Sequence, residues 1–194
     1  MKRDQLTGVV LAGGRARRLG GIDKGLLPYR SRPLIDYALR ALEPLCGEIL
    51  INANRNLDDY RRFGHPVIPD TLPDFQGPLA GILAALRRAK TPTLLVVPCD
   101  SPHLSDVVLA RLPAALDDGY EIAIAHDGQR LHPVVMALRT ELADDLAAWL
   151  AAGRHKIDRW AQRHRWTAVD CRDHPDAFLN INTPEDLHGD HRTQ

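Results

Sequence analysis

Short apolar runs alternate with amphipathic segments along most of this chain, and this alternation limits the possible folds more than any other feature. The runs at residues 6–11, 48–52, 67–70 and 94–98 have the length and composition of buried strands. The stretches between them place apolar residues three or four positions apart, which is typical of helices that bury one face. The pattern therefore predicts an α/β protein with a mostly parallel central sheet and helices on both faces.

The remaining elements follow from the same periodicities and from turn residues. The expected helices span residues 33–45, 58–63, 77–88, 106–116, 140–153 and 156–164. Thr140 is the expected cap of the helix that Gly153 ends. Strands are expected at 121–125 and 133–138, joined by a turn at Asp127-Gly128, and at 166–169. Residues 178–182 alternate apolar side chains with asparagine, so we expect a strand there, followed by a helix that Thr183 caps.

The bulk properties bound the domain count and exclude several classes of protein. With 194 residues the chain is long enough for one domain with a sizeable core, which we expect to be a Rossmann-like three-layer sandwich over residues 1–194. The formal net charge is zero, so the surface as a whole is not drawn to nucleic acid or to an anionic membrane. The cysteines number three and lie far apart, which favours reduced thiols and a cytoplasmic location. We expect no signal peptide and no membrane span.

The loop that follows the first strand is the main functional signal. It contains Gly13, Gly14, Gly20 and Gly21 together with the cations Arg15, Arg17, Arg18 and Lys24. Exposed backbone N–H groups beside clustered cations favour a polyphosphate, which indicates a bound nucleoside triphosphate. The alternative is a solvated loop that joins a strand to a helix. A P-loop is excluded because Gly25 follows Lys24, and the dinucleotide fingerprint is excluded because no residue separates Gly13 from Gly14.

Asp100 follows the most apolar predicted strand, at the edge where α/β proteins bind ligands. A carboxylate in that position suits Mg²⁺, which takes its other ligands from water and phosphates. The alternative is a cap for the helix that begins near Ser105. No cysteine or histidine pattern completes a zinc site, and no nucleophile motif is present. Nucleotidyl transfer needs neither, because it depends on positioning, charge neutralisation and a metal.

Together these motifs resemble those of the nucleotidyltransferases, and in particular of the molybdenum cofactor guanylyltransferases (MobA type). The matching segments are Leu11–Gly25, Ile51–Arg55, Asp70, Gly77–Gly81, Pro98–Asp100, His132-Pro133 and Asn180–Glu185. The resemblance implies transfer of GMP from GTP to the phosphate of molybdopterin-bound molybdenum cofactor, with release of pyrophosphate. It implies Mg²⁺ as the cofactor, with Mn²⁺ as the alternative metal. It also divides the chain into a mainly nucleotide-binding half (1–100), a mainly acceptor half (101–187) and a polar tail (188–194).

The resemblance also assigns roles to single residues. Lys24, Asp100 and Arg18 are the expected catalytic residues, and Asp100 is the expected metal ligand. The other expected contacts to GTP are Leu11, Ala12, Gly13, Asn52 and Asp70. Asp70 is expected to accept from guanine N1–H and N2–H₂; the alternative for it is a turn acid. Expected contacts to the pterin are Asn180 and Asn182, which otherwise belong to a structural turn, and the segment Arg154-His155-Lys156, which otherwise begins a solvated helix.

Other functions stay open at the level of the sequence. They are cytidylyl transfer to the same pterin, nucleotidyl transfer to a sugar phosphate, and a nucleotide-binding regulatory module without catalysis. The expected partners are GTP and molybdopterin, with cofactor-insertion proteins and molybdoenzymes as further candidates. We expect no nucleic acid partner and no membrane partner, and we expect a monomer.

Overall fold

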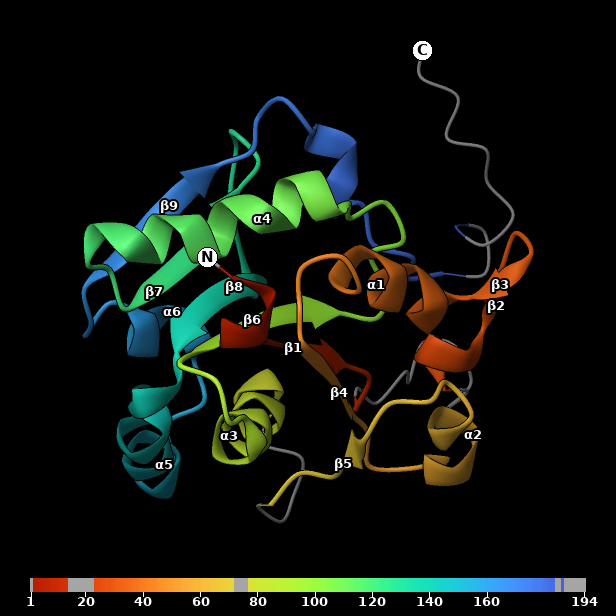
Figure 1. Ribbon diagram of the computed structural model, residues 1–194, viewed down its shortest axis with the longest axis horizontal. Helices are drawn as coiled ribbons and strands as arrows, with labels where there is room; N and C mark the ends of the chain where they lie inside the picture. Colours follow the sequence, from red (N-terminus) through yellow and green to blue (C-terminus); the bar gives the residue numbers. More distant parts are fainter. Residues whose placement is uncertain (1, 14–22, 72–76, 184–185, 187–194) are drawn as a thin grey trace.

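The computed structural model describes residues 2–13, 23–71, 77–183 and 186 of the chain. Arg18, most of the glycine-rich loop and the polar tail therefore lie outside the described residues. Figure 1 shows a twisted sheet with helices packed on both of its faces. The strands of this sheet are β1 (Leu6–Leu11), β4 (Glu48–Asn52), β5 (Val67–Ile68), β6 (Thr93–Pro98), β7 (Ile122–His126), β8 (Leu131–Arg139) and β9 (Trp166–Asp170).

Within the described residues the main sheet has seven strands in the order β5-β4-β1-β6-β8-β7-β9. The strand β8 runs antiparallel to both of its neighbours, and the other paired strands run parallel. A separate two-stranded ribbon pairs β2 (Pro28–Tyr29) with β3 (Arg32–Pro33). The predicted fold class, a single α/β domain with a mostly parallel sheet, is confirmed.

Alternate residues of the central strands point to opposite faces of the sheet and divide the core in two. On one face, Val10, Ile51 and Val97 belong to the cluster that packs against the helices α1 (Leu34–Leu42) and α4 (Asp106–Ala115). On the other face, Val9, Leu50 and Val96 belong to the cluster beneath α3 (Pro78–Arg88), α5 (Ala143–Ala151) and α6 (Ile157–Ala161). These strand residues are fully buried, and each contributes about 1.5–3 kcal/mol through the hydrophobic effect.

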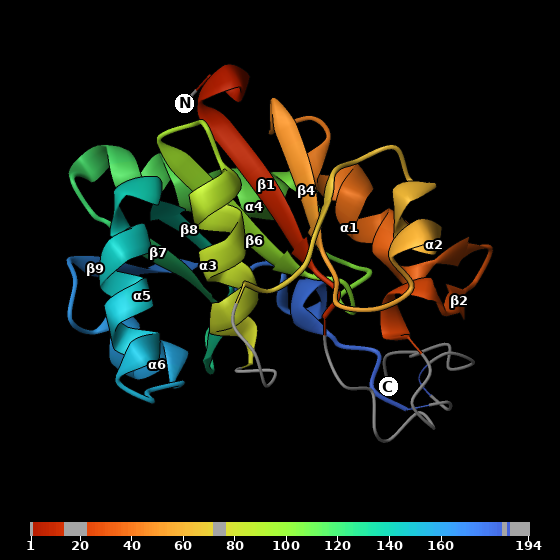
Figure 2. The same ribbon diagram turned by 90° about the horizontal axis from the view of Figure 1, so that it is seen from below.

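The second helical layer lies opposite α1 and α4, as Figure 2 shows from below. Its helices are α3 (Pro78–Arg88), α5 (Ala143–Ala151) and α6 (Ile157–Ala161). The short helix α2 (Leu57–Arg61) lies between β4 and β5 in the chain. The helix α3 begins at Pro78, one residue after the predicted start, and it follows Gly77, whose φ of 75° an L side chain rarely adopts. Among the described residues, every helix is too short or too polar to span a lipid bilayer.

The predicted hairpin at Asp127-Gly128 is confirmed, since β7 and β8 pair directly. The Asp127 carboxylate accepts the backbone N–H groups of Gln129 and Arg130 at 2.7 and 2.8 Å and so closes the turn. Gly128 supplies the positive φ that the turn requires.

Two local predictions are wrong. Thr140 does not cap α5, because a 3₁₀ turn (Thr140–Leu142) comes first and the Thr140 hydroxyl donates to the Thr91 carbonyl oxygen at 2.8 Å. Residues 178–182 do not form a strand. They leave a 3₁₀ turn (Pro175–Phe178) and lie against the end of β6, where the Ile181 N–H donates to the Asp100 carbonyl oxygen at 2.9 Å. The alternating pattern arises because Phe178 and Ile181 are buried while the asparagines are exposed.

The connections place the topological switch point of the sheet at the carboxyl ends of β1 and β6. The chain leaves β1 through α1 toward β4, and it leaves β6 through α4 toward β7, in the opposite direction across the sheet (Figure 1). Two neighbouring parallel strands whose connections diverge in this way form the crevice where open α/β sheets bind ligands.

Candidate functional site

The candidate site is built on the ends of three adjacent strands. Leu11 at the end of β1 pairs with Asn52 of β4 on one side and with Pro98 of β6 on the other. Beyond the strands, the Ala12 N–H donates to the Asn52 carbonyl oxygen at 2.8 Å, and the Cys99 N–H donates to the Leu11 carbonyl oxygen at 3.2 Å. The ladder thus continues past the formal strand ends and fixes the backbone from which the side chains of the site extend.

Lys24 and Asp100 meet at one corner of this crevice. The Lys24 Nζ donates to Asp100 Oδ2 at 2.6 Å, and the two side chains are 16% and 19% exposed. The same Nζ donates to Asn182 Oδ1 at 2.9 Å. The structure therefore brings together three of the residues expected from the sequence. An ammonium in this position is a compact cation beside the crevice.

The second oxygen of Asp100 has no hydrogen-bond partner among the described residues although it is buried. A buried, unpaired carboxylate oxygen is costly, so this atom is suited to an external cation. The helix-cap alternative is excluded, because Ser105 caps α4 through its Oγ, which accepts the Val108 N–H at 3.4 Å.

Among the described residues, no three His, Cys, Asp or Glu side chains are grouped to hold a metal ion. One carboxylate with a buried oxygen that has no partner among the described residues suits a hard cation whose other ligands are water and phosphate oxygens. Nucleotidyltransferases typically work with such a divalent metal.

A buried acid next to Lys24 holds the turn that carries the lysine. Asp23 is 4% exposed, and its carboxylate accepts from the Tyr60 hydroxyl and, at 3.1 Å, from Asn56 Nδ2. Arg55 Nε lies 3.5 Å from the same carboxylate. Gly25 completes the arrangement, because a Cβ there would lie 2.5 Å from the Tyr60 oxygen. Burial, followed by the Asp23 hydrogen bond, raises the pKa of Tyr60 well above its ordinary value, so the phenol stays a donor.

Asp70 occupies a different corner, beyond the end of β5. Its Oδ1 accepts from Asn52 Nδ2 at 2.9 Å, and its Oδ2 accepts from Asn54 Nδ2 at 2.8 Å. The Asp70 N–H in turn donates to Asn54 Oδ1 at 2.8 Å. Two amides, one at the end of β4 and one two residues beyond it, thus hold the Asp70 carboxylate, and its expected contact with the base stays a prediction. Sequence reasoning missed Asn54 as a site residue; the spacing of Asn52 and Asn54, which places both on one side of extended chain, was the available signal.

Two glycines make room around Asn52. A Cβ at Gly81 of α3 would lie 2.2 Å from Asn52 Oδ1, so a side chain there is incompatible with this asparagine. A Cβ at Gly13 would lie 3.4 Å from the same oxygen and 3.0 Å from Asn54 Nδ2. The close approach of α3 and of the glycine-rich loop to the end of β4 thus requires glycine at one position and favours it at the other.

The segment around Asn180 and Asn182 lies beside the end of β6, where the Ile181 N–H donates to the Asp100 carbonyl oxygen. Asn180 Oδ1 accepts from the buried Ser101 hydroxyl at 2.7 Å, and Asn182 contacts Lys24 as described. Beyond them, the Asp186 carboxylate accepts the N–H groups of Asn182 and Thr183, while Thr183 Oγ1 accepts the Asp186 N–H at 3.3 Å. This reciprocal pattern is a capping box, and it agrees with the predicted cap at Thr183.

Cys99 lies next to Asp100 but is no candidate nucleophile. Burial, with a further contribution from the Asp100 carboxylate, raises the pKa of this thiol well above its ordinary value. Burial likewise raises the pKa of Cys46 to about 12. Both thiols therefore stay protonated and serve as small apolar core groups.

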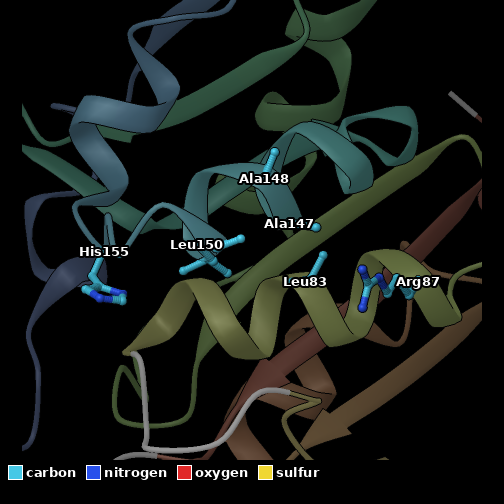
Figure 3. Close-up of a pocket in the computed structure, with 8 residues that line it drawn as sticks. Leu83, Arg87, Ala147, Ala148, Leu150 and His155 are labelled. Carbon is cyan, nitrogen blue, oxygen red and sulfur yellow. The ribbon is translucent and has the colours of Figure 1, made fainter.

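The segment Arg154-His155-Lys156 lies in the chain between α5 and α6. The Arg154 guanidinium stacks over Trp149 at 4.9 Å from the ring centroid. His155 stands at one end of an open groove of about 620 Å³ between α3 and α5, with Arg87 at the other end (Figure 3). The groove floor is apolar, with Leu83 and Leu150 on facing helices. The expected contact of this segment with the acceptor substrate stays a prediction.

Comparisons with known proteins agree with this geometry. The family model described as "MobA-like NTP transferase domain" matches residues 8–168. A molybdenum cofactor guanylyltransferase of Methylibium petroleiphilum is 48% identical over 193 residues, which cover 95% of this chain and 94% of that protein. One of Shewanella amazonensis is 45% identical over 184 residues and covers 94% of each chain.

Solved structures show the same fold. Molybdopterin-guanine dinucleotide biosynthesis protein A from Archaeoglobus fulgidus superposes with a TM-score of 0.77 at 24% identity, over 94% of this chain and 95% of that chain. The 4-diphosphocytidyl-2C-methyl-D-erythritol synthase of Anaerococcus prevotii superposes with a TM-score of 0.76 at only 11% identity, over 95% and 93% of the two chains. Likeness at these identities concerns the fold alone.

Proposed function

We propose that this chain, which belongs to the family of MobA-like NTP transferases, transfers GMP from GTP to the phosphate of molybdopterin that carries molybdenum. The observation on which the proposal rests is the Lys24–Asp100 pair at the strand ends, where one buried Asp100 oxygen has no partner among the described residues. The named guanylyltransferases that are 45% and 48% identical over most of the chain support the choice of nucleotide and acceptor.

The reaction is a phosphoryl substitution in which the atoms balance. An oxygen of the molybdopterin phosphate forms a bond to the α-phosphorus of GTP, and the bond from that phosphorus to the bridging α,β-oxygen breaks. The products are pyrophosphate and a guanine dinucleotide form of the cofactor. Negative charge increases on the departing pyrophosphate, so the residues near it must neutralise charge and hold the reactants in line.

Lys24 donates to the phosphate oxygens on which this charge develops. Its Nζ already lies at the crevice, held by Asp100 and Asn182, and the Asp23 carboxylate fixes the turn behind it. Arg18, in the part of the glycine-rich loop outside the described residues, is the proposed second phosphate contact. Asp100 holds a divalent cation, proposed as Mg²⁺ with Mn²⁺ as the substitute, and such an ion supplies Lewis-acid neutralisation of phosphate charge.

The nucleoside is held by the other side of the crevice. Backbone groups of Leu11, Ala12 and Gly13 contact the nucleotide where the loop leaves β1. Asn52 lines the nucleoside pocket, and Asp70 accepts from guanine N1–H and N2–H₂. Adenine presents an unprotonated N1 in that position, so a carboxylate there disfavours ATP.

The acceptor approaches from the β6 side. Asn180 and Asn182 are the proposed contacts to the pterin, since both lie beside the Lys24–Asp100 pair. Arg154, His155 and Lys156 are further cationic candidates for an anionic acceptor. We place the nucleotide mainly on residues 1–100 and the acceptor mainly on residues 101–187.

The test is release of pyrophosphate by the purified chain with Mg²⁺, molybdopterin carrying molybdenum, and GTP, CTP or ATP in turn. We expect release that requires the pterin and is selective for GTP. Release with CTP, or with a sugar phosphate as the acceptor, would move the protein to a related nucleotidyltransferase activity. Absence of release with every pair would overturn catalysis by this site.

A further inference from the structure

We infer that Asn54 is a positioning residue for guanine recognition, acting through Asp70. This inference rests on the proposed function, in which Asp70 reads the base. The residues form a closed ring of two hydrogen bonds: Asn54 Nδ2 donates to Asp70 Oδ2 at 2.8 Å, and the Asp70 N–H donates to Asn54 Oδ1 at 2.8 Å. One side chain therefore holds both the backbone and the carboxylate of Asp70.

The ring fixes the orientation of the Asn54 amide. Its oxygen must face the backbone N–H of Asp70, because a nitrogen there would place two donors against each other. The nitrogen must consequently face the carboxylate. The Asn52 amide is fixed in the same way, since its Nδ2 donates both to the Ile68 carbonyl oxygen at 3.2 Å and to Asp70 Oδ1 at 2.9 Å.

The partners of Asp70 are neutral, and this matters for the base. Among the described residues, no lysine, arginine or histidine forms an ion pair with Asp70, so two amides orient the carboxylate without neutralising it. An ionised carboxylate offers about four acceptor positions, of which the two asparagines use one on each oxygen. One position per oxygen remains, which matches the two parallel donors N1–H and N2–H₂ of guanine.

The location of Asn54 also suits this role. Its side chain is only partly buried, so it is not a core residue. A Cβ at Gly13 would lie 3.0 Å from Asn54 Nδ2, which places the amide beside the start of the glycine-rich loop. Asn54 therefore connects the segment proposed to contact the phosphates with the carboxylate proposed to read the base.

The experiment compares kcat/KM for GTP and ITP, because ITP lacks only the 2-amino group. We expect the protein to prefer GTP, and Asp70→Asn to remove most of this preference. Asn54→Ala should lower the GTP-over-ITP ratio by about tenfold, the order expected for one misdirected charged hydrogen bond. The change should appear in KM for GTP, with kcat at saturation nearly unchanged, since the reacting phosphates are bound elsewhere.

Asn54→Asp provides a second variant of the same shape and a pH readout. Its carboxylate still accepts the Asp70 N–H but repels the Asp70 carboxylate, so at pH 8 the preference for GTP should fall further than in Asn54→Ala. As the pH decreases, one of the two carboxyl groups binds a proton and can donate to the other. The GTP-over-ITP ratio should then recover. Arg55, the next residue in the chain, pairs with Asp23, with its Nε 3.5 Å from the Asp23 carboxylate.

Asn56→Gly is the matched control. It removes an amide from the same turn, and glycine accepts the positive φ of Asn56, but the lost hydrogen bond goes to Asp23. Turnover should fall equally for both nucleotides, which leaves the ratio unchanged. A purely structural role for Asn54 would likewise lower both rates together, in both Asn54 variants and without pH recovery, and would overturn the inference.

The outcomes separate this inference from the function on which it rests. If the unmodified protein does not distinguish GTP from ITP, the base-reading role of Asp70 fails, and the inference fails with it. If Asp70→Asn removes the preference while Asn54→Ala and Asn54→Asp keep it, only the inference fails. If Asn54→Ala does not fold, the ratio and pH profile of Asn54→Asp decide the question alone.

Discussion

Two carboxylates beyond the carboxyl ends of β5 and β6, which β4 and β1 separate in the sheet, are held in opposite ways. Asp100 pairs with the cation of Lys24 through one oxygen, while its other oxygen is buried and unpaired among the described residues. Asp70 has a hydrogen bond on each oxygen, and both donors are neutral amides. The first arrangement leaves one strong acceptor for a second cation. The second leaves a directed negative charge for neutral donors. The same residue type is thus prepared for two different ligands by its neighbours.

Asp100 should be the more costly of the two to remove. Asp100→Ala deletes the carboxylate proposed to hold the cation and leaves the Lys24 ammonium without its ion-pair partner. We expect turnover to fall about a thousandfold, since each ~1.4 kcal/mol of lost charge stabilisation costs about tenfold. Pyrophosphate release measures the loss, and Asp106→Ala, an exposed acid at the start of α4, is the control. Full turnover that still required Mg²⁺ would disprove the metal assignment.

Substitution of Lys24 tests the other member of the Lys24–Asp100 pair. Lys24→Ala should lower kcat about a hundredfold, the usual effect of losing one donor to charge that develops in the transition state. Lys24→Arg should recover little of it, because a planar fork does not occupy the position of a compact ammonium. Lys90→Ala, at an exposed position after α3, controls for net charge. Additive losses in the double variant with Asp100→Ala would show that the pair does not act as a unit.

Substitution of Asp70 should change the preference between nucleotides and leave the Mg²⁺ requirement unchanged. Asp70→Asn should lower the GTP-over-ITP ratio by about tenfold or more, because an amide cannot accept both guanine donors. The Mg²⁺ concentration for half-maximal turnover should stay unchanged, whereas Asp100→Asn should raise it. Metal titrations of the two Asp→Asn variants under identical conditions make this comparison. A similar rise in both would mean that the two corners are not independent.

The sequence predicted the strand ends well because strand periodicity and glycine are local signals. Asp100 follows the apolar run of β6, and Asn52 ends β4, so their placement at one edge needs only the parallel arrangement of the strands. The pairing of side chains across the chain was not predictable. Lys24 and Asp100 lie 76 residues apart, and the Tyr60 contact with Asp23 depends on how α2 packs.

The wrong predictions also have physical reasons. Thr140 has the residue type of a helix cap, but the Thr91 carbonyl oxygen accepts its hydroxyl, and the chain makes a 3₁₀ turn before α5. Residues 178–182 have the alternation of a strand but form a ladder with no other strand in the described part of the chain. Both features depend on tertiary neighbours that a local pattern does not specify.

Substitution of Tyr60 tests whether the position of Lys24 depends on the hydrogen bonds to the buried Asp23 carboxylate next to it. Tyr60→Phe keeps the ring in the core and removes one hydrogen bond to the Asp23 carboxylate. We expect the free energy of unfolding to fall by about 2 kcal/mol, as for a buried hydrogen bond to a charged group. Turnover should fall less than in Lys24→Ala. Denaturant unfolding and pyrophosphate release measure the two effects, with Tyr120→Phe as the control, and unchanged stability would show that Asn56 and Arg55 suffice to hold Asp23.

A third carboxylate, Asp127, has a side-chain partner of another kind, the imidazole of His132, where Asp100 has an ammonium and Asp70 has amides. His132 Nε2 lies 2.7 Å from Asp127 Oδ2, and this contact is the largest cause of the lowered pKa of Asp127. Because its pKa is lowered in the folded state, the ionised Asp127 carboxylate stabilises the fold at pH values above its ordinary pKa of 3.8. This stabilisation is lost progressively as the pH falls below 3.8. His132→Ala removes the largest cause, so the variant should lose less stability between pH 7 and pH 3 than the unmodified protein. Thermal unfolding at both pH values tests this. Equal losses would mean that the backbone donors of the turn, and not the imidazole, hold the Asp127 charge.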